Sequence, residues 1–316
     1  MDTPANELSF RALRDRDEVK DLLAVRQASA AHDRLDPLST CEHVADFDEL
    51  TRLTDDERLI VVTAHDQIVG DICLSQWRES DGTNVYLHNL HLDPRARSPQ
   101  RWQAMLDYAE QCLRQQAGGA VDQAVFASNA SATETDQARL LHDNGYQVVW
   151  TMIEMELTNF DVAPPVLVPG DIVVGAPRPD EYRAIWQMNE EVYAGTWGYI
   201  APDHDESDFV ASHLAQPELC LVARQREKIV GFILCQQKDD VAVIGEFSVA
   251  KDMQGRGIGR ILLTRVIGLL GQRGAHRIRL HTDADNQARA RGLYERIGFQ
   301  PIKLYYRFRK PMSRNV

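Results

Sequence analysis

Long apolar runs are missing from this sequence. No stretch approaches the roughly 20 consecutive apolar residues that a membrane-spanning helix needs. The first residues, Met1-Asp2-Thr3-Pro4, also lack the basic and then apolar layout of a secretory signal. We therefore expect a cytoplasmic protein that has no membrane partner.

Cysteine is scarce, and the sequence contains no CxxC pair. Because an odd number of cysteines cannot all pair within one chain, we expect reduced and mostly buried thiols at Cys41, Cys73, Cys112, Cys220 and Cys235. Histidine offers no better metal set. His88 and His91 would point to opposite faces of a strand, and His142 lies far along the chain. No metal is predicted.

Basic residues are outnumbered by acidic ones, 35 to 47, which gives a formal net charge of −12. A protein that binds nucleic acid needs a basic surface to neutralise phosphates. The charge balance therefore argues against a nucleic-acid partner and favours a small or cationic one. Low-complexity tracts are absent as well, so we expect folded structure throughout the chain.

A chain of 316 residues with 44% hydrophobic residues is long enough for two domains. The segment 159–170 contains three prolines and a glycine, which oppose both helices and sheet hydrogen bonds. We predict that 159–170 is a linker between one domain at 1–158 and another at 171–316.

The same order of elements is predicted on both sides of this linker, which indicates a duplicated domain. Gly145-Tyr146-Gln147 corresponds to Gly298-Phe299-Gln300, with an offset of 298 − 145 = 153. We expect an α+β fold in each half, with a mixed and mostly antiparallel twisted sheet flanked by helices. The expected strands are 9–13, 59–64, 67–77, 85–92, 120–127, 147–157, 172–175, 219–223, 229–235, 241–249, 277–282 and 303–309, and the expected helices are 17–29, 100–116, 134–143, 180–193, one that follows Gly259, and 286–297.

A glycine-rich segment, Gln254-Gly255-Arg256-Gly257-Ile258-Gly259-Arg260, precedes a predicted helix in the second half. Glycines leave backbone N–H groups uncovered at the positive end of a helix, and such a site binds anions such as a pyrophosphate. Three glycines before a helix can also form an ordinary turn. The preceding strands are predicted to be antiparallel, which disfavours a Rossmann site, and no Gly-Lys-Ser/Thr follows as in a Walker loop.

Two motifs together resemble the cofactor site of the GNAT superfamily of N-acetyltransferases. The first is Gln254-x-x-Gly257-x-Gly259, and the second, further along the chain, runs from Asn286-x-Ala288 through Tyr294 to Gly298-Phe299. The resemblance implies that acetyl-CoA is the acyl donor. It also implies a donor-binding set of Phe247, Ser248, Val249, Gln254, Gly255, Arg256, Gly257, Ile258, Gly259, Arg260 and Asn286.

The resemblance further implies that Tyr294 is the general acid that protonates the departing CoA thiolate. Glu246 is the candidate general base. It lies in an otherwise apolar strand, where burial would raise its pKa toward neutrality. The ordinary alternatives are an aromatic ring that fills a helix face at Tyr294 and an outward-facing strand carboxylate at Glu246.

Aromatic residues near the end of the predicted helix 180–193 lie where the acceptor-side helices of the family occur. The resemblance implies that Tyr193, Trp197 and Tyr199 line the acceptor pocket, with Tyr305 on the last strand beside them. Aromatic residues in such places also serve the hydrophobic core, and both interpretations stay open.

The first half keeps the order of elements but lacks the loop. With an offset of 249 − 92 = 157, the positions of the loop motif are taken by Arg97, Gln100 and Trp102. Pro99 removes one more backbone donor, and Leu141 stands where the second half has its candidate acid. We predict that the first domain is catalytically silent and covers the active domain or completes its acceptor cleft.

The resemblance implies an N-acetyltransferase with tandem domains, similar in architecture to mycothiol synthase, and with one working site in 171–316. The leading hypothesis is direct transfer of an acetyl group to a primary amine of a small molecule. A protein or peptide amine is an alternative acceptor. A non-catalytic protein that binds acetyl-CoA as a sensor is an alternative class. We expect a monomer or a homodimer.

Overall fold

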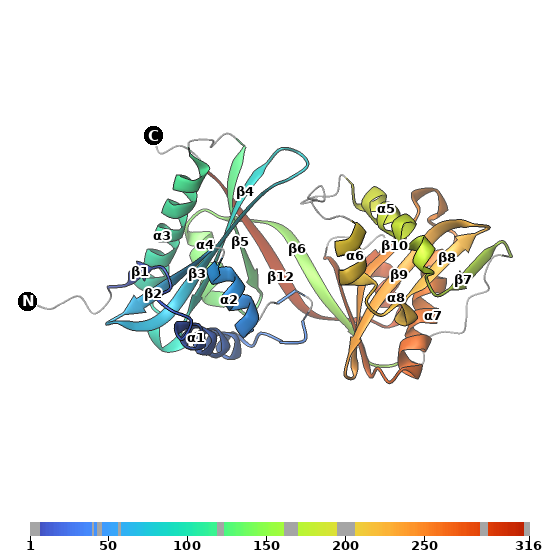
Figure 1. The fold of residues 1–316 in the computed structure, drawn as a ribbon, viewed down its shortest axis with the longest axis horizontal. Coiled ribbons are helices and arrows are strands. Elements are labelled where there is room, and N and C mark those ends of the chain that lie inside the picture. Colours follow the sequence, from blue (N-terminus) through green and yellow to red (C-terminus); the bar gives the residue numbers. More distant parts are fainter. Residues whose placement is uncertain are drawn as a thin grey trace, which may run out of the picture. The chain divides into compact units, whose positions relative to one another are not determined.

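The computed structural model describes residues 7–39, 41–42, 46–55, 58–118, 123–160, 170–194, 206–284 and 290–312. Figure 1 shows the helices and strands along the chain. Contacts between Cα atoms divide the chain into two units. Unit 1 comprises Met1–Met152 together with Leu304–Val316, and unit 2 comprises Ile153–Lys303.

Unit 1 is built on a mostly antiparallel sheet. Its elements are β1 (Ser9–Arg11), α1 (Glu18–Asp33), α2 (Phe47–Asp55), β2 (Leu59–Ala64), β3 (Gln67–Arg78), β4 (Asn84–Leu92), α3 (Pro99–Ala117), β5 (Ala124–Ser131), α4 (Thr135–Asp143), the start of β6 (Gln147–Leu157) and the end of β12 (Gln300–Pro311). Strands β1 to β4 pair in sequence as antiparallel neighbours, and β4 and β5 are parallel. β12 then pairs antiparallel with β5, from Tyr305 opposite Ser131 to Pro311 opposite Val125.

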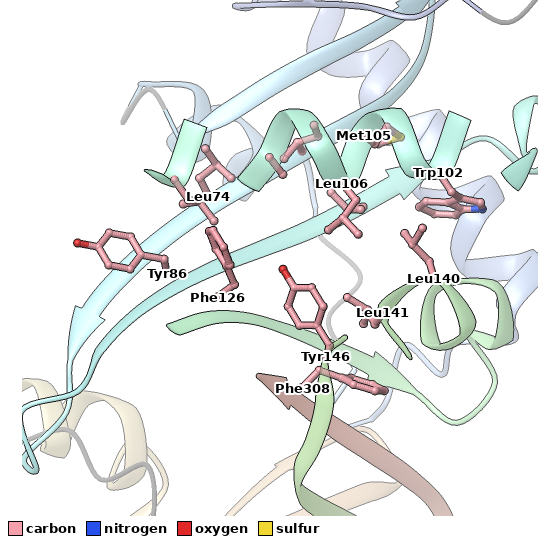
Figure 2. Packing of buried hydrophobic residues seen from close by; sticks show 14 of the residues in the cluster. Leu74, Tyr86, Trp102, Met105, Leu106, Phe126, Leu140, Leu141, Tyr146 and Phe308 are labelled. Carbon is pink, nitrogen blue, oxygen red and sulfur yellow. The ribbon is translucent and has the colours of Figure 1, made fainter. Parts of the chain in front are cut away.

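Helices of unit 1 bury two separate apolar clusters against its sheet. Trp102, Met105 and Leu141, from α3 and α4, pack in one cluster with Phe126 and Tyr146 (Figure 2). The buried positions of α3 recur every three or four residues, as a helix with one buried face requires. The second cluster joins α1 and α2 to β2 and β3.

Unit 2 repeats this architecture. Its elements are the end of β6, β7 (Ile172–Gly175), α5 (Tyr182–Tyr193), α6 (Glu206–His213), β8 (Leu221–Gln225), β9 (Lys228–Lys238), β10 (Val241–Val249), α7 (Ile258–Gln272), β11 (Arg277–Asp283), α8 (Gly292–Ile297) and the start of β12. Strands β7 to β10 pair in sequence as antiparallel neighbours. β10 and β11 are parallel.

The two faces of the unit 2 sheet carry different helices. Phe232 and Leu234 of β9 pack with α5 and α6 in one buried cluster. Gly231, the residue before Phe232, leaves room for α7, because a Cβ there would lie 3.2 Å from Leu262 Cδ1. Side chains of a strand alternate between faces, so α7 covers the face opposite to α5 and α6.

The α+β class and the repeated order of elements are confirmed. One shared contact matches the offset of 153. The N–H group of Phe299 donates to the carbonyl oxygen of Tyr294 at 3.0 Å, and that of Tyr146 donates to Leu141 at 3.0 Å. The short helices α2 and α6 were not predicted, because each has fewer than three turns from which to detect a period.

The division into units differs from the predicted domain limits at the C-terminus. The sequence places 171–316 in one domain, whereas Leu304–Val316 belongs to unit 1. The physical reason is the pairing of β12 with β5, which no periodicity within β12 could reveal. Most of the predicted linker, 161–169, lies outside the described residues.

None of the five cysteines, all of which are described, forms a disulfide. Within the described ranges, no helix is long and apolar enough to cross a membrane. The same residues contain no group of three or more His, Cys, Asp and Glu side chains that could hold a metal ion.

Candidate active site

A β-bulge in β10 positions the candidate base. Ile244 pairs with Cys235 and Glu246 pairs with Leu234, so Gly245 is the extra residue on β10. Because Leu234 packs with α5 and α6, Glu246 opposite to it faces the same helices. The parallel register between β10 and β11 ends at Val243, which leaves the backbone at 246–249 without this neighbour.

The glycine-rich segment has the backbone that an anion site requires. Gly255 and Gly257 have φ angles of 76° and 82°, in the left-handed region that favours glycine. Gly257 caps α7 without a side-chain hydrogen bond, and its carbonyl oxygen accepts from the N–H group of Ile261 at 3.0 Å. The N–H groups of 258–260 therefore have no partner within the helix and face the loop.

Contacts of Gln254 and Gly259 fix this loop against β10. Gln254 Nε2 donates to the carbonyl oxygen of Val249 at 3.1 Å. A Cβ at Gly259 would lie 3.3 Å from the ring of Phe247, so the glycine allows the first turn of α7 to approach the strand. Arg256 and Arg260 are exposed, which adds positive charge beside the uncovered N–H groups.

Tyr294 lies on the short helix α8, which ends at Gly298 with a φ angle of 119°. Only 5% of Tyr294 is exposed. Its ring centroid is 6.2 Å from that of Phe247 and 5.9 Å from that of Phe299. Burial, and then the negative charge of Glu246, raise the pKa of Tyr294, so its hydroxyl keeps its proton near neutral pH.

The surroundings of Glu246 shift the pKa of its carboxyl group toward neutral pH. Burial raises the pKa of Glu246 to about 7, a hydrogen bond from Tyr193 opposes this shift, and the charge of Glu190 adds to it. Desolvation, followed by the charge of Glu246, also raises the pKa of Tyr193. The structure therefore brings together Glu246, Tyr193 and Tyr294, three residues named in the sequence analysis.

The remaining predicted site residues lie in different parts of the chain. Trp197, Tyr199 and Asn286 lie outside the described residues. Tyr305 belongs to unit 1, where its hydroxyl is hydrogen-bonded to Ser39 Oγ at 2.9 Å. Ser248 is buried, and its hydroxyl lies beside that of Tyr193, whose pKa it lowers.

Sequence reasoning missed two neighbours of the site. Glu190 stands three residues before Tyr193 on α5, and this spacing could have placed both on one helix face. His213 of α6 lies beside the bulge, with Nδ1 3.7 Å from the position of a Cβ on Gly245. No local pattern could have found His213, because its proximity depends on the packing of α6.

The corresponding loop of unit 1 is closed by its own side chains. Arg97 donates to both carboxylate oxygens of Asp33, at 2.7 and 2.6 Å. Ser98 Oγ accepts from the N–H group of Arg101 at 3.2 Å, and Pro99 at the first position of α3 has no N–H group. The helix N-terminus that is left open by glycines in unit 2 is thus occupied by side chains of the same unit in unit 1.

The site thus combines a glycine-capped helix, a bulged strand that carries a carboxyl group of raised pKa, and a buried tyrosine. The model of the acetyltransferase (GNAT) family matches residues 184–299. A [ribosomal protein bS18]-alanine N-acetyltransferase of Salmonella typhimurium is 31% identical over 116 residues, which are 37% of this chain and 72% of that protein. The chain belongs to the GNAT acetyltransferase family.

Other relatives match shorter parts of their own length. N-alpha-acetyltransferase 30 of Schizosaccharomyces pombe is 33% identical over 99 residues, covering 29% of this chain and 64% of that protein. A mycothiol acetyltransferase of Streptomyces scabiei is 34% identical over 151 residues, covering 45% of this chain and 47% of that protein. The chain thus spans less than two thirds of the length of both relatives.

Two solved structures share the fold over nearly the whole chain. A GCN5-related N-acetyltransferase from Sphaerobacter thermophilus has a TM-score of 0.74 at 22% identity and covers 98% of this chain and 97% of that one. A tandem GNAT protein from the clavulanic acid biosynthesis pathway has a TM-score of 0.68 at 13% identity and covers 98% of this chain and 100% of that one. At these identities the likeness concerns the fold, which is a tandem GNAT arrangement.

Proposed function

We propose that unit 2 transfers an acetyl group from acetyl-CoA directly to a primary amine. The observation that carries the proposal is the position of Glu246, whose pKa is about 7, behind a bulge on the strand that leads to the glycine-rich loop. A general base works best when its pKa lies near the working pH. An ordinary, outward-facing carboxylate on a strand would lack this raised pKa.

The residues of unit 2 fit the acyl donor. The uncovered N–H groups at the start of α7 suit its pyrophosphate, and the positive φ angles of Gly255 and Gly257 keep side chains away from that position. Residues 246–249 pair with β9 on one side and have no β11 neighbour on the other, and this open side suits hydrogen bonds to the amides of the pantetheine arm. Asn286 is proposed to complete this set.

Two proton transfers are assigned to two side chains. Glu246 accepts the proton of the acceptor ammonium group, so that the free amine can form a C–N bond to the acetyl carbon. Tyr294 donates its hydroxyl proton to the sulfur as the C–S bond breaks, and the second proton, which the nitrogen loses on becoming an amide, returns through water to the Tyr294 oxygen. The raised pKa of Tyr294 supports this role, because the proton is present at neutral pH.

The acceptor is proposed to be a small-molecule amine, held in unit 2 by Tyr193, Trp197 and Tyr199. A peptide or protein N-terminal amine is the second candidate. It is favoured by similarity to N-alpha-acetyltransferase 30 and to [ribosomal protein bS18]-alanine N-acetyltransferases. We propose a catalytically silent unit 1 and a cytoplasmic protein, monomeric or homodimeric, that binds neither nucleic acid nor membranes.

The test is release of free CoA thiol from acetyl-CoA, measured with the full chain. A panel of small primary amines and a panel of short peptides with free N-termini would be compared at equal concentrations. Thiol release with matching acetylated product in either panel supports the transferase and selects the acceptor class. Tight acetyl-CoA binding without release in both panels would instead indicate a sensor.

A further inference from the structure

Glu246 is approached by two side chains from one helix. Glu190 and Tyr193 lie three residues apart in the last turns of α5, so they project from neighbouring positions on one face. The Tyr193 hydroxyl donates a hydrogen bond to the Glu246 carboxylate and accepts one from Ser248, the neighbour of Phe247 on the same strand. Glu190 places a second negative charge in the surroundings of the same carboxylate.

The hydrogen bond from Tyr193 and the charge of Glu190 act on Glu246 in opposite directions. A hydrogen bond donated to a carboxylate stabilises its ionised form, whereas a neighbouring negative charge destabilises that form. A base that removes a proton from an ammonium group needs both properties. It must be ionised when the acceptor binds, and it must hold the proton once it has been transferred.

The other groups around Glu246 carry no charge near neutral pH among the described residues. Burial and the charge of Glu246 raise the pKa of Tyr294 on α8, which stays protonated. Burial lowers the pKa of His213 on α6, so the imidazole beside Gly245 stays neutral. Glu190 is therefore the charged group, within the described structure, that acts on Glu246.

We propose that the end of α5 positions and tunes the base, with Tyr193 holding the Glu246 carboxylate in place and Glu190 opposing its ionisation. Tyr193 is a positioning residue in this scheme, distinct from its proposed place in the acceptor pocket. The role of Glu246 as a general base rests on the proposed function. The contact between α5 and Glu246 does not, and the two can be tested separately.

The variants that test the proposal are Tyr193→Phe and Glu190→Gln. Tyr193→Phe removes the hydroxyl and keeps the ring, and the residue is 36% exposed. Tyr182→Phe and Glu191→Gln are matched controls on the same helix. Tyr182 packs at the other end of α5, and Glu191 is exposed beside Glu190.

The experiment is a pH titration of the full chain labelled with ¹³C at the glutamate carboxyl carbon, with Glu246 identified by the signal that Glu246→Gln removes. Tyr193→Phe is expected to raise the midpoint of Glu246 by about one pH unit, and Glu190→Gln to lower it by about one pH unit. The acid limb of kcat/KM should move in the same directions. Both control variants should leave the midpoint unchanged.

The outcomes separate this inference from the proposed function. Unchanged midpoints in both variants, in a protein that still acetylates amines, would overturn the role of α5 alone. Opposite midpoint shifts in a protein that never turns over would support the contact and count against the transferase. Shifts of the same sign in both variants would also overturn the inference, because the two contacts must oppose each other.

Discussion

Arg97 in unit 1 and Gln254 in unit 2 make the same contact at equivalent positions. Gln254 Nε2 donates to the carbonyl oxygen of Val249 at 3.1 Å, and Arg97 Nε donates to that of Leu92 at 3.2 Å. The guanidinium group of Arg97 then binds Asp33, which neutralises its charge inside unit 1. The two units keep one scaffold, but only the unit 2 loop leaves its backbone donors open to an anion.

This difference predicts one acetyl-CoA site per chain. Replacing Gly257 with Gln should reduce affinity at least tenfold, because a residue with a Cβ resists the φ angle of 82° and its side chain projects over the N–H groups of 258–260. A left-handed non-glycine residue costs about 1–2 kcal/mol. Calorimetric titration of acetyl-CoA into the full chain measures stoichiometry and affinity together.

Gly268→Ala provides the matched control, since Gly268 lies within α7 and a Cβ there meets open space. It should bind acetyl-CoA normally and gain about 0.5–1 kcal/mol of stability, as expected for alanine in a helix. Two sites in the parent chain would contradict a silent unit 1. Unchanged binding in Gly257→Gln would mean that the loop does not hold the donor.

Removing the Tyr294 hydroxyl should slow the chemical step without weakening donor binding. Tyr294→Phe keeps the ring that packs against Phe247 and Phe299, and loses the proton donor. We expect kcat to fall by about 10²–10⁴. Single-turnover kinetics and acetyl-CoA titration would be compared with Tyr108→Phe, a stacked tyrosine of unit 1. A loss of binding that matches the loss of rate would assign Tyr294 to structure instead of catalysis.

The activity should depend on ionisation of Glu246. Since the base must be ionised, kcat/KM is expected to fall tenfold per pH unit below about 7, the pKa of Glu246. Glu246→Gln should abolish this limb together with most of the activity. An acid limb that persists unchanged in the variant would place the titration on the acceptor amine or on another side chain.

The same carboxyl group should also make stability depend on pH. Its pKa is raised from 4.5 to about 7 in the folded chain, so the favourable protonated state is fully present below pH 4.5 and is lost as pH rises through 7. Glu246→Gln should therefore unfold with a higher free energy than the parent at pH 8, by at most about 3 kcal/mol. Chemical denaturation at pH 4 and pH 8 measures the difference, which should disappear at pH 4.

Much of this arrangement could be predicted from residue spacing. The glycines at 255, 257 and 259 predicted the loop before α7, and the equivalence of Gly145-Tyr146 to Gly298-Phe299 predicted the duplicated domain. Both predictions depend on local backbone geometry, which residue spacing reveals. Tyr294 and Glu246 were selected through the family resemblance and the apolar strand around the carboxylate.

Tertiary contacts set the limits of that prediction. Tyr305 belongs with Ser39 in unit 1 because β12 pairs with β5, and pairing between strands so distant in sequence leaves no periodic signal. The proximity of His213 to Gly245 likewise requires α6 to pack over the bulge. Local sequence specifies each element, but it does not specify which distant element lies beside it.

The last strand, β12, allows a direct test of which unit residues 304–311 belong to. Phe308 of β12 is 1% exposed in the unit 1 core, and Lys310 Nζ donates to Glu110 Oε1 at 2.7 Å. Phe308→Ala should lower the free energy of unfolding of unit 1 by about 3–5 kcal/mol. Ile302→Ala, on the same strand but 43% exposed, should change it by less than about 0.5 kcal/mol.

Hydrogen exchange read strand by strand locates the effect. Because β12 pairs with β5, Phe308→Ala should speed exchange of the β5 amides in unit 1 much more than exchange of the β10 amides in unit 2. The Ile302→Ala chain should match the parent in both strands. Faster exchange in β10 with β5 unaffected would return residues 304–311 to the second domain, where the sequence alone had placed them.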